Sequence, residues 1–153
     1  MCIRHSVWPN CQIYEVDSMK GNQLARILDY YGCDKVINNS KSLLGLSQRI
    51  QRHKYAKYRS ITIRKTRISG NTTTYSEYYK TVTALKSGGI TAVYQSHCYM
   101  NADDLSADDI TWGIIVSKPK LYQWIDENPD KVYERRTKDT NQIQTFYFIY
   151  SSD

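Results

Sequence analysis

One long stretch of the chain carries only one sign of charge. Between residues 35 and 76 the sequence has ten Lys and Arg residues and no Asp or Glu. A folded chain usually interleaves the two signs, so such a stretch costs repulsion unless it lies at a surface where an anion relieves it. The acidic residues gather later in the chain, at Asp103, Asp104, Asp108, Asp109, Asp126, Glu127 and Asp130. The charge pattern therefore predicts a basic surface with an anionic partner.

The whole chain fits one basic domain spanning residues 1–153. Its composition, 41% hydrophobic and 24% charged with a net charge of +6, allows a buried core without disulfides or metals. No apolar run reaches the roughly 18 residues that span a bilayer, and the first ten residues lack the apolar segment of a signal peptide. We therefore expect a cytoplasmic protein with free thiols and no membrane partner.

The spacing of apolar residues predicts an α+β fold. Three- and four-residue spacing predicts helices over residues 20–31, 40–52, 74–86 and 119–125. Alternating β-branched and aromatic residues predict strands over residues 11–16, 59–68, 90–98, 111–117, 131–136 and 142–150. Thr74 and Glu77 have the spacing of a capping box at the start of the third helix. The expected architecture is a single domain of helices packed on a small antiparallel sheet.

Aromatic residues interleave with the basic ones where the charge is densest. Arg and Lys neutralise phosphates and release counterions, whereas Tyr stacks on bases or hydrogen-bonds to phosphate. This mixture is what a surface that follows a nucleic-acid backbone needs. We therefore expect nucleic-acid contacts from Arg49, Arg52, Lys54, Tyr55, Lys57, Tyr58, Arg59, Arg64, Lys65 and Arg67.

The helix predicted over residues 74–86 has a polar face and an apolar face. Ser76, Lys80 and Thr83 lie opposite an apolar stripe, and their side chains suit phosphates and base edges in a major groove. The apolar stripe comprises Tyr75, Tyr78, Val82 and Leu85.

The segment from Tyr78 to Ile90 resembles the end of the recognition helix in winged-helix DNA-binding domains. In that family an apolar pair precedes a Leu, and the helix ends on Gly and leads into an apolar strand that starts the wing; here the matching residues are Val82, Leu85, Gly88 and Ile90. The resemblance covers about a quarter of the chain. It implies a winged-helix-like fold in which Ser76, Lys80 and Thr83 face duplex DNA and residues 90–117 form the wing.

Two nuclease mechanisms and a metal site remain as alternatives. The acidic segment at residues 101–109 offers oxygen ligands for Mg²⁺, and His53 or His97 would suit a general base in a metal-free RNase. The spacing of the possible zinc ligands fits no common site; these are Cys2, His5, Cys11 and Cys33. We expect no cofactor.

These patterns favour a nucleic-acid-binding protein without enzymatic activity. Duplex DNA is favoured over RNA by the winged-helix resemblance alone, and a regulatory or replication role in a phage or plasmid would suit so small a domain. The main rival is a small nuclease. A third alternative is an interaction or inhibitor module that meets a protein partner through Asp103, Asp104, Asp108 and Asp109.

Overall fold

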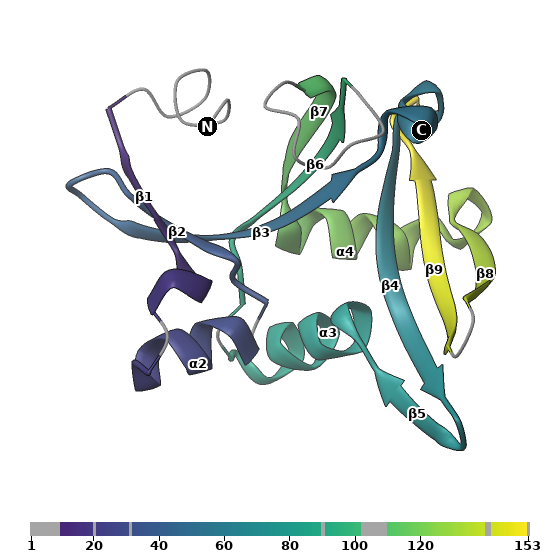
Figure 1. Ribbon diagram of the computed structural model, residues 1–153, viewed down its shortest axis with the longest axis horizontal. Helices are drawn as coiled ribbons and strands as arrows, with labels where there is room; N and C mark the ends of the chain where they lie inside the picture. Colours follow the sequence, from purple (N-terminus) through teal and green to yellow (C-terminus); the bar gives the residue numbers. More distant parts are fainter. Residues whose placement is uncertain are drawn as a thin grey trace.

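Two β-sheets form the frame of the fold in the computed structural model (Figure 1), which describes residues 10–19, 21–30, 32–89, 91–101, 110–139 and 142–152. The first sheet has the strand order β1-β2-β3-β6-β7 and the second has the order β5-β4-β9-β8. The chain passes from one sheet to the other three times, so neither sheet is a continuous segment. The two sheets and their helices therefore belong to one α+β domain.

The strands of the first sheet are β1 (Gln12–Glu15), β2 (Lys35–Asn38), β3 (Leu43–Gln51), β6 (Tyr94–Met100) and β7 (Ile110–Ser117). Those of the second are β4 (Ser60–Ser69), β5 (Thr72–Tyr75), β8 (Tyr133–Asp139) and β9 (Gln142–Tyr150). The described helices are α2 (Gln23–Tyr30), α3 (Glu77–Ser87) and α4 (Lys118–Glu127), with 3-10 turns η1 (Val16–Met19), η2 (His53–Tyr58) and η3 (Pro129–Lys131). Within these residues no helix is long and apolar enough to cross a membrane.

The main core lies where α4 packs against the second sheet. Side chains alternate between the two faces of a strand, so every second residue of β4 and β9 faces the helix. Tyr78 and Val82 of α3 pack against the same cluster. The buried members of the cluster are Ile61, Ile63, Leu121, Tyr122, Ile125 and Ile149. The opposite face of the second sheet is thereby left to polar and aromatic side chains, which build the site described below.

The helix predicted over residues 40–52 is wrong, because this segment is the strand β3. The Asn39 Oδ1 atom accepts hydrogen bonds from the backbone N–H groups of Lys41 (3.1 Å) and Ser42 (2.8 Å), and Ser40 adopts a φ of 65°. This side-chain turn reverses the chain, so β3 pairs antiparallel to β2. On its other side, β3 pairs parallel to β6. The helical spacing of its leucines is coincidental, since Leu46 is buried whereas Leu43 is exposed.

Gly45 explains why β3 can approach its neighbours so closely. A Cβ atom at this position would lie 2.7 Å from Cys33 Sγ and 3.3 Å from the backbone Cα of Ala92. Replacing Gly45 with alanine is therefore expected to destabilise the fold by about 1–3 kcal/mol through overpacking. The measurement is urea denaturation, with Gly113→Ala as the control. At Gly113 of β7 the nearest atom to a Cβ is Cys98 Sγ at 3.4 Å, so that change should be nearly neutral.

The structure has two sheets where one small antiparallel sheet was expected, and the first of them is mixed. Its β3 and β6 strands run parallel. The hairpin expected at residues 90–117 exists as β6 and β7, but nearly all of β6 is buried inside the five-stranded sheet. This hairpin is therefore an integral part of the first sheet.

The start of α3 differs from the predicted capping box. Residues 72–75 form the strand β5, and the helix begins at Glu77 with Ser76 as its N-cap residue. The Ser76 side chain makes no capping hydrogen bond. Tyr75 and Leu85, both expected in the buried stripe, are exposed. The other predicted helices and strands correspond to described elements with ends shifted by a few residues.

Candidate nucleic-acid interface

The face of the second sheet turned away from α4 carries two phenylalanines of β9. Phe146 and Phe148 alternate with Tyr147 and Ile149, which belong to the core cluster. The strand register places Phe146 between Arg64 and Arg135, and Phe148 between Thr62 and Tyr133. Residues paired across antiparallel strands share a face, so this surface combines flat rings with guanidinium groups.

A groove of about 570 Å³ follows this face, and we call it the aromatic groove. The Arg49 guanidinium lies 4.9 Å from the centre of the Phe146 ring, and the Arg135 guanidinium lies 5.0 Å from that of Phe148. Each ring is thereby paired with a cation. The groove is defined by Arg49, Arg52, Tyr55, Tyr58, Phe146 and Phe148, with Arg135 at its edge.

The 3-10 turn η2 supplies the two tyrosines of the groove. Tyr55 and Tyr58 are three residues apart, and side chains at this spacing lie above one another in a 3-10 helix. Their exposed fractions are 45% and 43%. Arg59 ends the turn in the left-handed region, with a φ of 42°, and leads directly into β4. The turn therefore holds two accessible rings beside the phenylalanines.

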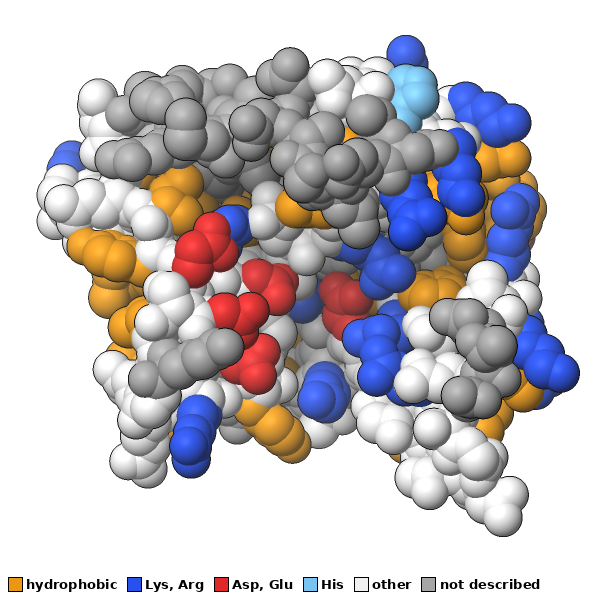
Figure 2. Space-filling view, viewed as in Figure 1, with side chains coloured by type: hydrophobic (Ala, Val, Ile, Leu, Met, Phe, Trp, Pro, Cys, Tyr) orange, Lys and Arg blue, Asp and Glu red, His pale blue; other side chains and the backbone are white. Residues whose placement is uncertain are grey.

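A second hollow, here called the inter-sheet cleft, has a volume of about 390 Å³. Its basic lining residues are Arg49, Arg64, Arg67, Lys80 and Lys118, and its acidic lining residues are Asp29, Asp34 and Glu77. Figure 2 shows acidic side chains mainly on the side of the hollow toward α2 and β2, and basic ones mainly on the side toward β4. Arg49 lines both hollows and connects them.

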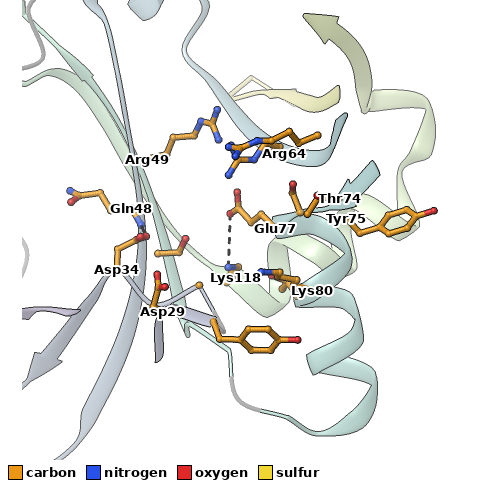
Figure 3. Close-up of a pocket in the computed structure, with 16 residues that line it drawn as sticks. Asp29, Asp34, Gln48, Arg49, Arg64, Thr74, Tyr75, Glu77, Lys80 and Lys118 are labelled. Atoms are coloured by element: carbon orange, nitrogen blue, oxygen red, sulfur yellow. Dashed lines mark hydrogen bonds and ion pairs between the residues drawn. The ribbon is translucent and has the colours of Figure 1, made fainter. Parts of the chain in front are cut away.

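Lys118 and Glu77 form an ion pair at the base of the cleft (Figure 3). The Lys118 Nζ atom is completely buried and lies 3.9 Å from Glu77 Oε1. Burial lowers the pKa of Lys118, and the nearby carboxylates oppose this shift. Burial also raises the pKa of Asp34, although its Oδ2 atom accepts a 2.6 Å hydrogen bond from the backbone N–H of Gln48.

The structure brings most of the predicted contact residues to the two hollows. Arg49, Arg52, Tyr55 and Tyr58 line the aromatic groove, and Lys54 and Lys57 lie about 5 Å from the rings of the adjacent tyrosines, at 5.2 and 5.0 Å. Four further predicted residues line the cleft, namely Arg64, Arg67, Ser76 and Lys80.

Besides Lys54 and Lys57, three predicted residues line neither hollow. Arg59 and Thr83 are exposed but line neither hollow. Lys65 faces the opposite side of the sheet, where its Nζ atom lies 2.6 Å from Glu134 Oε2 and 4.3 Å from the Tyr147 ring centre. Burial lowers the pKa of Lys65, but hydrogen bonds to Glu134 and Tyr147 outweigh this and raise it to about 12.

Sequence reasoning missed Arg135, Phe146, Phe148, Glu77 and Lys118. Phe146 and Phe148 stand in the strand predicted over residues 142–150, where apolar residues on both faces are typical of a largely buried strand. The sequence did hold one indication of this surface. Phe146 and Phe148 are two residues apart in a predicted strand and therefore share a face, and Arg135 lies in the strand predicted before it. Glu77 and Lys118 lie far apart in the sequence and carried no indication of their pairing.

The catalytic alternatives find limited support among the described residues. His97 is only 1% exposed, and burial together with the charge of Arg49 lowers its pKa to about 3, so it cannot reach a phosphodiester in either hollow. His53 is exposed, with Nδ1 3.2 Å from the Met100 carbonyl oxygen. The described residues contain no group of three or more metal ligands. Several candidate ligands and partner contacts lie outside them, namely Cys2, His5, Asp103, Asp104, Asp108 and Asp109.

Lowering the pH from 7 to 5 is expected to cost about 2 kcal/mol of stability through His97 alone. The imidazole titrates near 6.5 in the unfolded chain and near 3 in the folded one. Between these values the unfolded chain binds the extra proton, so this stability is present above pH 6.5 and is lost as the pH falls. Urea denaturation at both pH values measures the free energy of unfolding. Between pH 7 and pH 5 this free energy should fall by about 2 kcal/mol less in His97→Gln than in the wild-type protein. Equal losses in the two proteins would contradict the assignment.

Comparison of the chain with protein-family models, with curated proteins and with solved structures found no match.

Proposed function

We propose that the protein binds single-stranded nucleic acid along the aromatic groove. The observation that carries the proposal is the set of rings and guanidinium groups on one face of the second sheet. Bases stack on aromatic side chains irrespective of sequence, and cations beside them neutralise the backbone phosphates. Tyr55 and Tyr58 offer accessible rings, while Arg52 and Arg135 lie at the same groove.

The groove favours a single strand over a duplex. Bases inside a duplex are stacked on one another and cannot lie against Tyr55 or Phe148, whereas the bases of a single strand are free to do so. The winged-helix resemblance would place helix α3 in a major groove. Not all three of the residues expected to contact the bases there are accessible. Ser76 is 8% exposed and lines the inter-sheet cleft, so it cannot reach the base edges of a duplex.

The proposal retains a role in regulation or replication and a cytoplasmic location. Cys11 and Cys33 are free thiols, which suits a reducing compartment. A regulator or replication factor requires binding without strand cleavage, and the buried His97 supports this.

The test is fluorescence anisotropy with internally labelled single-stranded DNA, single-stranded RNA and duplex DNA over a salt series. We expect the single strands to bind more tightly than the duplex, with affinity that falls steeply as salt rises. Arg52→Gln should lower the slope of log affinity against log salt by about 0.7 for each phosphate that the variant no longer neutralises. Arg26→Gln removes an exposed charge from α2 and serves as the matched control.

Absence of binding to every probe at low salt would overturn the proposal. Tighter binding of the duplex would instead support the recognition-helix expectation. Gel analysis of each probe after the titration separates a binding protein from a nuclease, because a nuclease leaves shortened strands.

A further inference from the structure

The inter-sheet cleft holds more positive charge than its own acidic residues balance. Five cationic side chains line it, against three carboxylates. Among the described residues, only Lys118 of these five forms an ion pair, with Glu77. Arg49, Arg64, Arg67 and Lys80 have no carboxylate within ion-pairing distance in the described part of the chain. Cations gathered in a partly desolvated cleft repel one another unless an anion lies between them.

The two arginines of β4 are brought to this cleft by an irregularity in the strand. Arg64 pairs with Phe146 and Arg67 pairs with Gln144, but the register shifts between Arg64 and Thr66. In a regular strand, residues three apart face opposite sides of the sheet. The bulge puts both guanidinium groups on the cleft side, and bulges that re-aim side chains are common beside functional sites.

Both arginines have donors without an acceptor. The Nε atoms of Arg64 and Arg67 are buried and make no hydrogen bond, and the same is true of the buried Lys118 Nζ atom. A buried donor without an acceptor is costly, so such groups usually have a partner in the functional state. The proximity of Arg67 also lowers the pKa of Arg64, second to burial. These features point to an anion that accepts hydrogen bonds from both guanidinium groups.

The start of α3 adds further donors to the same place. Ser76 leaves the first turn without a side-chain cap, so its free N–H groups and the positive end of the helix dipole are available to an anion. Glu77 lies between Arg64 and Lys118 (Figure 3), and its carboxylate is held by Lys118. Arg67 and Lys80 are left for a ligand that enters from solvent.

The acidic side of the cleft restricts what that ligand is. Asp29 and Asp34 line the wall opposite β4, and both are accessible to solvent. A strand that runs along the aromatic groove reaches the cleft at Arg49, and its next phosphate would then meet these carboxylates. Like charges at this point disfavour continuation of the strand. The basic path therefore ends in the cleft.

We propose that the inter-sheet cleft binds the terminal phosphate monoester of the nucleic-acid strand that lies in the aromatic groove. This inference rests on the function proposed above and adds the recognition of a strand end. A terminal phosphate carries more charge than an internal phosphodiester and has three acceptor oxygens. Arg64 and Arg67 supply planar donors suited to those oxygens, and Lys80 supplies a further cation.

The experiment compares three ten-nucleotide single strands of one sequence, each with an internal label. One strand has hydroxyl groups at both ends, one has a 5′-phosphate and one has a 3′-phosphate, so the measurement also identifies which end is bound. We expect one phosphorylated strand to bind the wild-type protein about tenfold more tightly than the hydroxyl strand, in line with charge-assisted hydrogen bonds. Arg67→Gln should remove this preference and leave the affinity for the hydroxyl strand nearly unchanged.

Two further variants complete the design. Lys86→Gln removes a charge from the exposed end of α3, away from the cleft, and should keep the preference. Lys80→Gln, at an exposed position that lines the cleft, should reduce it and is the second test if Arg67→Gln fails to fold.

The outcomes separate the two proposals. Equal binding of all three strands, or a preference that persists in both cleft variants, would overturn the terminal-phosphate site and leave the aromatic groove intact. Failure of every strand to bind would overturn the proposed function and this inference together.

Discussion

Replacement of Glu77 by glutamine is expected to destabilise the protein by about 3 kcal/mol, whereas replacement of Lys118 by methionine is expected to be nearly neutral. The Lys118 ammonium is completely buried, and Glu77 is its only ion-pair partner among the described residues. Removing the carboxylate takes away the largest of the compensating charges around the buried ammonium. Removing the ammonium eliminates its desolvation cost, and the Glu77 side chain, which is 20% exposed, is left with access to water.

Urea denaturation of both single variants and of the double variant measures this asymmetry. The double variant should be close to Lys118→Met in stability, because glutamine at position 77 no longer has a buried charge to leave unpaired. Equal destabilisation by the two single changes would contradict the account. It would indicate that Lys118 contributes through packing of its side-chain stem instead.

Replacing Tyr55 and Tyr58 together with alanine is expected to weaken binding of single-stranded nucleic acid by about 100-fold. Each base that stacks on an aromatic ring contributes about 1–3 kcal/mol, so removal of two rings gives an effect of this order. The slope of log affinity against log salt should stay unchanged, because every cation that neutralises a phosphate is still present. Anisotropy titrations across a salt series measure both quantities.

Tyr14→Ala is the matched control for this experiment. Tyr14 lies on β1 of the first sheet and has an exposed fraction of 44%, close to those of the groove tyrosines. A loss of affinity in Tyr14→Ala equal to that in the double variant would show that the groove is not the binding surface. A reduced salt slope in the double variant would mean that the tyrosine hydroxyls contact phosphates.

The α+β class and most element positions could be predicted from local patterns. Helix α4 begins at Lys118 with Pro119 in its first turn, where its missing N–H costs nothing. The strand β3 was not predicted because its conformation depends on the Asn39 turn and on pairing with β6, which is distant in the sequence. A local pattern carries no information about such a partner.

The basic and aromatic residues of the candidate site could be found from the composition of the sequence. The side of the sheet that each of them faces depends on the strand register and could not be predicted. Arg49, Arg52, Tyr55 and Tyr58, which the basic stretch singled out, lie together at one groove. Lys65 was counted with its neighbours, yet the alternation of the strand turns its side chain to Glu134 on the other face, whereas the bulge returns Arg67 to the face of Arg64. One irregular residue thus decides which charges act together, and periodicity alone cannot locate it.

The alternation of the chain between the two sheets has a consequence for how the protein is made. Strand β9 is an interior strand of the second sheet, yet it follows all other described strands in the sequence, and Ile149 pairs with Ile61. On the ribosome, β4 therefore emerges long before its central neighbour exists, with Ile61 and Ile63 unprotected. Closing so long a loop is slow, and exposed strand edges favour aggregation in the meantime. Since Phe146 and Phe148 belong to β9, the aromatic groove cannot form until this strand has been synthesised.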